Sequence, residues 1–191
     1  MNYLKKNQRY EQILNVAIEV LINEGISAIT ARKIAAKANI AVGLIHNHFK
    51  SIGELKSIAL IKVTDQLLER HQAKTGDKTH VEKIINAVSP IHGEDGAILR
   101  QIWNEALFLS ERDLDIKQAY QCSTNEWHEY VANLINAAVE DGALNTNIPS
   151  DLAWRLIALC CGFDNLSIIN EFDQSTINDH ILALLAPPIT D

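Results

Sequence analysis

The sequence is poor in cysteine, in residues that break helices, and in long hydrophobic runs. Its three cysteines are an odd number and two are adjacent, so they form neither a disulfide framework nor the Cys-x-x-Cys spacing of zinc and redox sites. The longest apolar runs, residues 156–163 and 181–189, are far shorter than the roughly 18 residues that a membrane span needs. We therefore expect no membrane partner, and we interpret the cysteines as small buried apolar residues.

The sequence also lacks the motifs of several other classes of protein. Residues 1–12 carry positive charge, but no apolar block follows them, so they do not resemble a secretion signal and we expect a cytoplasmic protein. The phosphate-binding patterns GxxxxGKS/T and GxGxxG and the nucleophile pattern Gly-x-Ser-x-Gly are absent. His46 and His48 are two residues apart, which on a helix points them about 200° apart and prevents them from sharing an ion. We expect no catalytic residue, no metal and no cofactor, and hence no enzyme.

The charge of the chain is divided between its two ends. The whole sequence has 17 basic and 24 acidic residues and a net charge of -7, which by itself argues against nucleic acid as a partner. Residues 1–62, however, contain nine basic and four acidic residues, and the remainder contains eight basic and 20 acidic residues. A basic N-terminal segment can approach phosphate while an acidic body keeps the protein soluble. The alternative is a chance clustering of charge on a solvated face.

Few residues interrupt a helical pattern along the chain. There are only four prolines and eight glycines, and apolar residues recur at helical spacing, which predicts an all-α protein of about nine helices. We expect the first helix to end at Gly25, in a left-handed conformation. The predicted helices cover residues 7–24, 31–38, 42–48, 53–74, 79–89, 96–110, 113–141, 150–170 and 174–186.

Residues 30–50, TARKIAAKANIAVGLIHNHFK, predict two short helices joined by a tight turn. Thr30 is a suitable N-cap for the first of them, and Asn39 tolerates the positive φ that the turn requires. At 100° per residue, Val42, Ile45 and Phe49 share one face of the second helix. We expect that face to pack on the core.

The opposite face of the second helix carries an unusual set of exposed groups. It presents Gly43, Leu44 and Asn47, with His46 and His48 on its flanks. An Asn amide pairs with adenine, a Leu side chain contacts a thymine methyl, a Gly lets the backbone approach DNA, and an imidazole donates to phosphate or to a base. This pattern favours insertion into a DNA major groove; the alternative is a solvated helix of an ordinary bundle.

The same segment resembles the DNA-binding domain of the TetR family of bacterial transcriptional regulators. In that family a first helix ending in Gly precedes a helix of the type T-x-x-x-I-A-x-x-A, a turn, and a short recognition helix that ends in an aromatic-His-Phe-like run. The matching residues are Gly25, Thr30, Ile34, Ala35, Ala38, Ile40, Val42, Gly43, Ile45, His48, Phe49, Ser51, Glu54 and Leu55. The resemblance implies a helix-turn-helix DNA-binding domain over residues 1–52 and a helical effector-binding and dimerisation domain over residues 53–191.

The sequence departs from the family at several positions. Asn39 replaces the usual glycine of the turn, His46 the usual tyrosine, Lys50 a common proline, and Ile52 a frequent lysine. Phosphate contacts are therefore expected at Lys50, at Lys56 and at the N-terminus of the helix that contains Lys56. For Arg32, contact with a guanine edge and contact with phosphate both remain open. The predicted DNA-binding residues are Thr30, Arg32, Val42, Gly43, Leu44, His46, Asn47, His48, Lys50 and Lys56.

The body of the chain is expected to hold a dimer interface and an effector pocket. One recognition helix contacts few base pairs, so such modules act as two-fold dimers on palindromic sites. Helix 150–170 carries two apolar stripes, which implies burial on two sides, although enclosure within one subunit is the alternative. The resemblance also implies that the last two helices pair with those of a second subunit. The candidate interface residues are Trp154, Ile157, Cys161, Ile168 and Ile181.

The aromatic residues of the middle helices occupy the region where the family binds its effector. They are interpreted as pocket residues, with an ordinary core as the alternative. Tryptophans in an acidic body would suit a cation, and the body also resembles the choline-responsive BetI-type branch. The candidate pocket residues are Trp103, Leu107, Phe108, Tyr120, Trp127 and Tyr130.

These patterns together predict a homodimeric regulator, most simply a repressor, that binds a palindromic double-stranded DNA operator and is released by an unidentified small-molecule effector. A rival hypothesis is a helical ligand-binding or enzymatic protein whose N-terminal domain has lost DNA binding. His46 and Ile52, which depart from the family pattern, keep that rival open.

Overall fold

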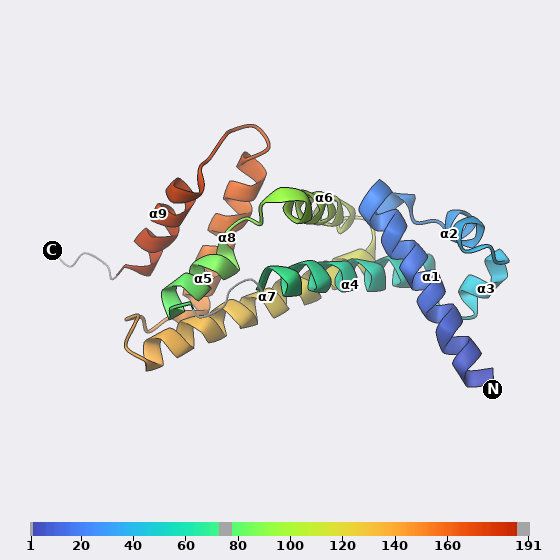
Figure 1. Cartoon of the computed structure of the whole chain (residues 1–191), viewed down its shortest axis with the longest axis horizontal. Helices are drawn as coiled ribbons and strands as arrows, with labels where there is room; N and C mark the ends of the chain where they lie inside the picture. The colour runs from blue at the N-terminus through green and yellow to red at the C-terminus, as the bar shows by residue number, and fades with distance from the viewer. Residues whose placement is uncertain (1, 73–77, 187–191) are drawn as a thin grey trace. The chain divides into compact units, whose positions relative to one another are not determined.

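A computed structural model describes residues 2–72 and 78–186 of the chain. Within these ranges the structure contains nine α-helices, one short 3-10 helix and no strand, which confirms the predicted all-α class (Figure 1). The helices are α1 (Asn2–Glu24), α2 (Ala31–Ala38), α3 (Val42–His46), α4 (Ile52–Gln72), α5 (His80–Val88), α6 (Gly93–Leu109), α7 (Leu114–Glu140), α8 (Pro149–Leu166) and α9 (Gln174–Leu185), with the 3-10 helix η1 at Ile26–Ala28.

Most predicted boundaries lie within a few residues of the observed ones, and three differ informatively. The first helix begins at Asn2 rather than at residue 7, because no helix breaker precedes it. The recognition helix α3 ends at His46, and the following residues continue as a turn in which the His48 and Phe49 amides donate to the Ile45 carbonyl oxygen. Helix α8 ends at Leu166, four residues before the predicted end.

The chain divides into two compact units. The first unit comprises the residues up to Leu67 together with Ala97–Ser123, and the second comprises Leu68–Gly96 together with the residues from Thr124 onward. Helices α1 to α4 thus pack with most of α6 and the first part of α7. The predicted division is one of function, into a DNA-binding domain (residues 1–52) and an effector-binding and dimerisation domain (residues 53–191), and it stays a prediction.

The core of the first unit forms around one face of α1. Apolar residues of α1 pack against α2, the segment after α3, and the N-terminal half of α4; α1, α2 and α3 follow one another in Figure 1. Gly25 after α1 has φ +89° and ψ 173°, a positive φ as predicted but not the left-handed helical conformation. The largest fully buried side chains of this core include Ile13, Leu14, Leu21, Ile26, Ile29, Ile34, Ile45, Phe49, Leu55, Leu67 and Ile102.

The core of the second unit is built from α5, the C-terminal part of α7, α8 and α9. Helices α8 and α9 run beside each other in Figure 1, and both bury one apolar face in this core. The Trp127 indole Nε1 donates to the Ala87 carbonyl oxygen at 2.9 Å, which ties α7 to α5. No helix in the described part of the chain is long and apolar enough to span a membrane.

The cysteines are distributed differently from the prediction. Cys160 is buried as expected, and burial raises the pKa of its thiol well above the usual value. Cys122 and Cys161 are exposed, so the interpretation of all three as buried apolar residues is wrong for these two. They lie on the outward sides of α7 and α8, where the helical pattern did not distinguish a small apolar residue from a surface residue.

Candidate nucleic-acid interface and ligand pocket

Helix α2 is fixed at both of its ends. The Thr30 hydroxyl accepts a hydrogen bond from the Lys33 amide at 3.3 Å, which confirms the predicted N-cap. At the other end Asn39 has φ 52° and ψ 51°, the left-handed conformation that the turn was expected to need. The Gln12 side chain of α1 donates to the Ala38 carbonyl oxygen at 2.9 Å. The turn is therefore fixed by the left-handed Asn39 and by a hydrogen bond from α1 to the end of α2.

The recognition helix α3 rests on two buried side chains, Ile45 and Phe49. The Tyr10 ring of α1 stacks on the Phe49 ring with a centroid distance of 4.7 Å, and burial is the main reason that the pKa of Tyr10 is raised. Val42, predicted on the same buried face, is 41% exposed, so that part of the prediction is wrong. Val42 is the first residue of a five-residue helix, and no preceding turn covers it.

Four predicted contact residues lie on the outer side of α3. Gly43, Leu44, His46 and Asn47 are all exposed. A Cβ atom added to Gly43 would meet no atom within 4 Å, so nothing in the chain itself fills the space beside the helix. The orientation agrees with the face expected from the sequence, and contact of these residues with DNA stays a prediction.

His48 differs from the other residues of this surface because it is half-buried. Burial, and then the positive charges of Lys6 and Arg9, lower its pKa below the ordinary histidine value. His48 is therefore neutral at pH 7, since even an ordinary histidine is mostly neutral there. In this state it can donate one hydrogen bond, but it adds no positive charge to the surface.

The basic residues near α3 fall into two groups. Lys33 pairs with Glu24, Lys37 pairs with Glu19 at 2.9 Å, and Lys62 of α4 pairs with an acid of α1 at 3.2 Å. No ion pair among the described residues contains Arg32, Lys50 or Lys56. Arg32 and Lys50 are exposed and Lys56 is half-exposed, so these three predicted residues are available to an external phosphate, beside Lys6 and Arg9 of α1.

The N-terminus of α4, predicted as a phosphate site, already carries acidic side chains. The Ser51 hydroxyl accepts from the Glu54 amide at 2.9 Å, and the Glu54 carboxylate accepts from the Lys50 amide. Asp115, at the start of α7, accepts from the Ser51 hydroxyl at 3.3 Å. Two carboxylates thus occupy the positive end of the helix and would repel a phosphate there. This part of the prediction is wrong, whereas Lys50 and Lys56 themselves remain available.

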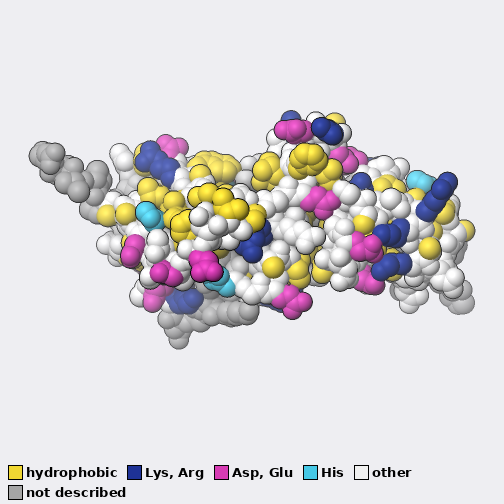
Figure 2. Space-filling model, turned by 90° about the horizontal axis from the view of Figure 1, so that it is seen from above, with side chains coloured by type: hydrophobic (Ala, Val, Ile, Leu, Met, Phe, Trp, Pro, Cys, Tyr) yellow, Lys and Arg dark blue, Asp and Glu magenta, His cyan; other side chains and the backbone are white. Residues whose placement is uncertain are grey.

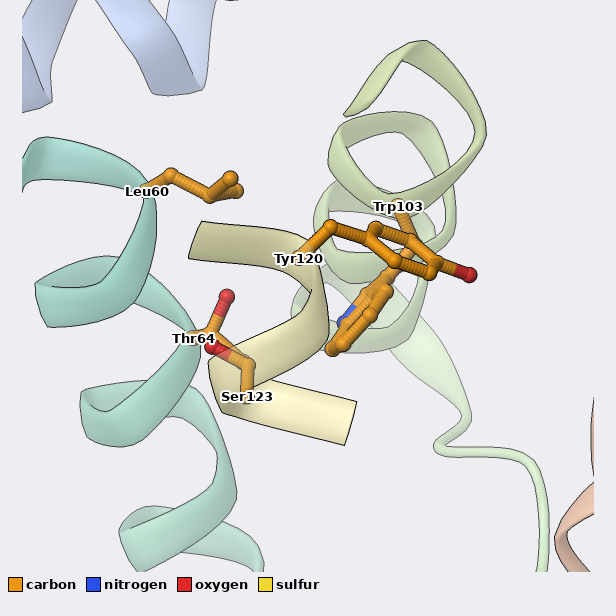
Figure 3. Close-up of a pocket in the computed structure, with 5 residues that line it drawn as sticks. All are labelled: Leu60, Thr64, Trp103, Tyr120 and Ser123. Atoms are coloured by element: carbon orange, nitrogen blue, oxygen red, sulfur yellow. The ribbon is translucent and has the colours of Figure 1, made fainter. Parts of the chain in front are cut away.

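A small pocket lies inside the first unit, between α4, α6 and α7. Two predicted residues, Trp103 and Tyr120, line it with their rings in edge-to-face contact at a centroid distance of 4.7 Å. The other lining residues are Leu60, Thr64 and Ser123 (Figure 3). None of the five carries a charge, so this pocket offers no carboxylate to the cation suggested by the sequence.

The other four predicted pocket residues do not line this pocket. Leu107 and Phe108 of α6 are on the surface; Phe108 is 61% exposed, and the Arg112 guanidinium carbon lies 5.6 Å from its ring centroid. Trp127 and Tyr130 belong to the second unit and pack on its core. The sequence identified an aromatic region, but helical spacing alone did not show which of two cores each ring enters.

Sequence reasoning missed Glu105, which connects α6 to the segment before the helix-turn-helix. One oxygen of its carboxylate accepts from the Ile26 amide at 2.7 Å, and the other accepts from the Ser27 amide at 2.8 Å and the Ser27 hydroxyl at 2.6 Å. A Cβ atom on Gly25 would lie 2.5 Å from this carboxylate, so glycine permits the close approach. No local pattern reveals this contact, because its partners are about 80 residues apart.

The predicted dimer residues divide into exposed and buried groups. Trp154, Cys161 and Ile168 are exposed. Ile157 and Ile181 are buried in the core of their own unit, so their assignment to an interface is wrong. Ile157 lies on the inner side of α8 and Ile181 on the inner side of α9, and the sequence did not distinguish these sides from the outer ones.

An exposed row of mostly small or apolar residues runs along α8. Hydrophobic side chains gather over the part of the molecule that holds α8 and α9 (Figure 2). Trp154, the largest residue of the row, is covered on one side by the His128 ring, which stacks on it at a centroid distance of 4.3 Å. We name this row the α8 stripe; it consists of Trp154, Ala158, Cys161, Gly162 and Asn165.

A family model described as bacterial regulatory proteins of the tetR family matches residues 13–56. These residues extend from the buried face of α1 to the first turn of α4 and include the whole helix-turn-helix. Residues 13–56 therefore match the DNA-binding region of the TetR family. The resemblance inferred from residues 25–55 is thus confirmed, while the resemblance of the body to the BetI-type branch stays a prediction.

Relatives of known sequence are also transcriptional regulators. The chain is 27% identical over 110 residues to an uncharacterized HTH-type transcriptional regulator of Xanthobacter autotrophicus, a match that covers 58% of this chain and only 50% of the relative. It is 26% identical over 157 residues to the HTH-type transcriptional repressor KstR2 of Mycolicibacterium smegmatis, covering 78% of this chain and 74% of that protein. Both relatives are named as transcriptional regulators, and the second aligns with more than three quarters of this chain.

Solved structures show the same fold over nearly the whole chain. A TetR-family regulator from Rhodococcus sp. superposes with a TM-score of 0.75 at 19% identity and covers 94% of this chain and 100% of that one. A regulator from Saccharomonospora viridis in complex with choline superposes with a TM-score of 0.69 at 20% identity, covering 93% and 95%. The likeness extends well beyond the helix-turn-helix to both units.

Proposed function

We propose that this TetR-family regulator is a dimeric repressor that binds a palindromic operator and releases it when a small molecule binds. The observation that carries the proposal is the outer side of α3, where Gly43, Leu44 and Asn47 are exposed above the buried Ile45 and Phe49. A side that presents a glycine, a leucine and an amide is poorly suited to water and well suited to base edges.

Base contacts would come from the middle of α3 and phosphate contacts from its surroundings. Leu44 and Asn47 can contact a thymine methyl and an adenine edge, and Gly43 lets the backbone come close to the DNA. Arg32, Lys50 and the neutral His48 can contact phosphate or a neighbouring base. Because Arg32 and Lys50 are in no ion pair among the described residues, contact with DNA would not require breaking one.

Dimerisation would double the length of DNA that the protein recognises. The α8 stripe supplies an exposed surface on which Trp154 is the largest side chain, and Ala158 and Gly162 are small enough for a second helix to approach closely. Two recognition helices related by a two-fold axis would fit successive major grooves, about one helical turn apart. A repressor role is supported by the relative named as a transcriptional repressor, which aligns with 78% of this chain.

Release would begin in the pocket between α4, α6 and α7. Trp103 lines that pocket, and Glu105, two residues later on α6, holds the Ile26 and Ser27 amides immediately before the helix-turn-helix. A ligand that displaces Trp103 would shift α6 and with it the carboxylate. A ligand that binds better to the shifted state would lower DNA affinity by the coupling free energy, typically about 1–3 kcal/mol.

The decisive experiment is a selection of random duplex DNA by the purified protein. We expect enrichment of a palindrome whose half-sites are about one helical turn apart. No enriched site at low or moderate salt would favour the rival hypothesis, a helical ligand-binding protein whose N-terminal domain no longer binds DNA. An enriched site without two-fold symmetry would contradict the dimer.

Gly43→Ala tests whether α3 is the surface that meets the DNA. The added methyl group meets no atom within 4 Å in the free protein, and alanine favours a helix over glycine, so folding stability should not fall. Close approach of the backbone to DNA leaves no room for the methyl group, and we expect at least about a tenfold loss of affinity for the selected site. Unchanged affinity in a normally folded variant would contradict the placement of α3 in the groove.

A further inference from the structure

Two buried hydroxyls face the pocket of the first unit without a partner. Thr64 is 1% exposed and Ser123 is 6% exposed, and neither hydroxyl oxygen has a hydrogen-bond partner in the structure. Both residues line the pocket with Trp103 and Tyr120. Figure 3 shows the two side chains extending toward one another from α4 and α7, with the aromatic rings beyond them. A buried hydroxyl without a partner is costly, so this arrangement needs an explanation.

Each of the two hydroxyls interrupts a row of apolar residues on its helix. Thr64 lies on the side of α4 that carries Leu60 and Leu67, and Ser123 follows Ala119 and Ile116 on α7 at helical spacing. Valine and alanine would fill the same positions without leaving a hydroxyl unpaired. The hydroxyls therefore weaken the core unless something outside the chain bonds to them.

The surroundings define the chemistry that the pocket accepts. No lysine, arginine, aspartate or glutamate is among the five lining residues, so a charged group would enter without a counter-charge. A neutral hydroxyl, carbonyl or amide group can donate to or accept from both hydroxyls. The Trp103 and Tyr120 rings provide an apolar surface for the rest of the molecule.

We propose that Thr64 and Ser123 bind the polar group of a neutral effector, whose apolar or aromatic part packs on Trp103 and Tyr120. The inference rests on the proposed function because it takes this pocket as the effector site. It replaces the cation that the acidic composition suggested with an uncharged, hydrogen-bonding ligand. The lining residues leave no room for a water molecule in this structure, so the ligand must move the Trp103 ring aside before it packs on it. Hydrogen bonds to two hydroxyls that the free protein leaves unpaired would offset part of that cost.

The test uses four probes that share one aromatic ring and differ in one substituent. Benzyl alcohol is neutral and forms hydrogen bonds, toluene forms none, benzylammonium is a cation and benzoate is an anion. Binding is measured with the full-length protein by calorimetry and by the shift of the Trp103 indole N–H resonance, which reports on the pocket itself. We expect benzyl alcohol to bind most tightly, with dissociation constants in the range of about 1–10 mM for such small probes.

Three variants separate recognition from packing. Thr64→Val and Ser123→Ala each remove a hydroxyl from the pocket and should each weaken benzyl alcohol binding about tenfold, with little effect on toluene. Ser57→Ala is the matched control, because Ser57 also carries a buried unpartnered hydroxyl on α4 but does not line the pocket. We expect it to leave binding of both probes unchanged.

Thermal unfolding of the same variants provides the second readout. Removing an unpaired buried hydroxyl should leave the Tm unchanged or raise it, so that binding and stability change in opposite directions. The proposal is overturned if Thr64→Val and Ser123→Ala bind benzyl alcohol as well as the unmodified protein does. Tighter binding of benzylammonium or benzoate at Trp103 would equally overturn it.

Failure of this inference is distinguishable from failure of the proposed function. The probe measurements require no DNA, and the DNA selection requires no effector. A protein that enriches a palindrome but binds only charged probes at Trp103 keeps its regulatory role and loses this inference. A protein that binds benzyl alcohol through Thr64 and Ser123 but enriches no DNA site keeps the ligand chemistry and loses the regulatory role.

Discussion

The two compact units differ in the side chains that hold their elements together. Among the described residues, the only polar residues that are buried as a whole, Thr64 and Ser123, both lie in the first unit. That unit also contains the carboxylate contacts of Glu105 and Asp115 with the N-terminal segments. In the described part of the second unit no polar residue is buried, although the Trp127 indole bond to Ala87 also ties its helices, and the same unit exposes the α8 stripe.

This difference matches two kinds of task. Hydrogen bonds to a carboxylate or hydroxyl are directional and can be exchanged for bonds to a ligand at modest cost, which suits a unit that changes state. Apolar contacts are non-directional and grow with the buried area, which suits a surface that stays assembled. The comparison predicts that polar substitutions in the first unit alter regulation, and that charged substitutions on the α8 stripe alter assembly.

The largest effect is expected from Trp154→Arg. If the α8 stripe is the dimer interface, a charge at its largest residue would cost about 2–4 kcal/mol and weaken self-association by roughly 30-fold to 1,000-fold. Sedimentation equilibrium over a range of concentrations measures this constant. Leu107→Arg, at an exposed leucine of the first unit, is the matched control and should leave self-association unchanged. Equal self-association constants for the two variants would show that the α8 stripe is not the dimer interface.

The next largest effect is expected from Glu105→Ala. It leaves the Ile26 and Ser27 amides without their acceptor, and we expect a loss of about 1–3 kcal/mol in the free energy of unfolding of the first unit. Urea unfolding measures the loss, and faster hydrogen exchange at the two amides locates it. Glu105→Gln keeps one acceptor oxygen and should lose less. If the exposed-site control Glu111→Ala destabilises as much, the contact has no special role.

A comparable effect, confined to one base pair, is expected from Asn47→Ala. Loss of an amide that pairs with adenine should reduce discrimination at a single position of the half-site by about 1–3 kcal/mol, while other positions keep their preference. A repeat of the DNA selection with the variant measures this. An unchanged preference at every position would show that Asn47 does not contact a base.

A smaller and more uniform effect is expected from Lys56→Ala. A phosphate contact carries no sequence information, so the variant should weaken binding to all DNA sequences alike and reduce the slope of log affinity against log salt by about one unit. Titrations at several salt concentrations measure the slope. Lys33→Ala is the control, because Lys33 is paired with Glu24. A slope reduced by Lys33→Ala but not by Lys56→Ala would reverse the assignment.

The smallest effect is expected from His48. Its pKa is lowered in the folded protein, so below the ordinary value of about 6.5 the unfolded chain binds more protons and stability falls as the pH falls. Above that value both states are neutral and His48 contributes no pH dependence. His48→Gln should therefore lose less stability than the unmodified protein between pH 7.5 and about 5.5. Thermal unfolding at both pH values measures this, and an equal fall in Tm for the variant and the unmodified protein would contradict it.

Local features of the first unit were predictable because neighbouring residues determine them. Thr30 caps α2 through the amide three residues later, and Asn39 adopts the left-handed turn by its own preference. The buried positions of Ile45 and Phe49 follow from helical spacing. Helical spacing also predicted burial of Val42, which is exposed. Spacing does not show where a short helix begins relative to the elements that would cover it.

Contacts between distant segments were not predictable from one sequence. Nothing near Glu105 indicates that it binds the amides of Ile26 and Ser27, and the two stripes of α8 look equally apolar although one contains the buried Ile157. Thr64 and Ser123 did leave a signal, since each interrupts an apolar row with a hydroxyl. A polar residue within an apolar row can therefore indicate a binding site, as a charged motif does.

The ion pairs between α1 and α2 affect how the protein would search a genome. Lys33 and Lys37 are already paired with Glu24 and Glu19, so two of the positive charges near the recognition helix are neutralised within the chain. Attraction to arbitrary DNA comes largely from unpaired cations, so these two pairs would shorten contacts with unrelated sequences. The protein would then spend less of its time on the wrong sites, and occupancy of its own target would depend more on the fit of α3.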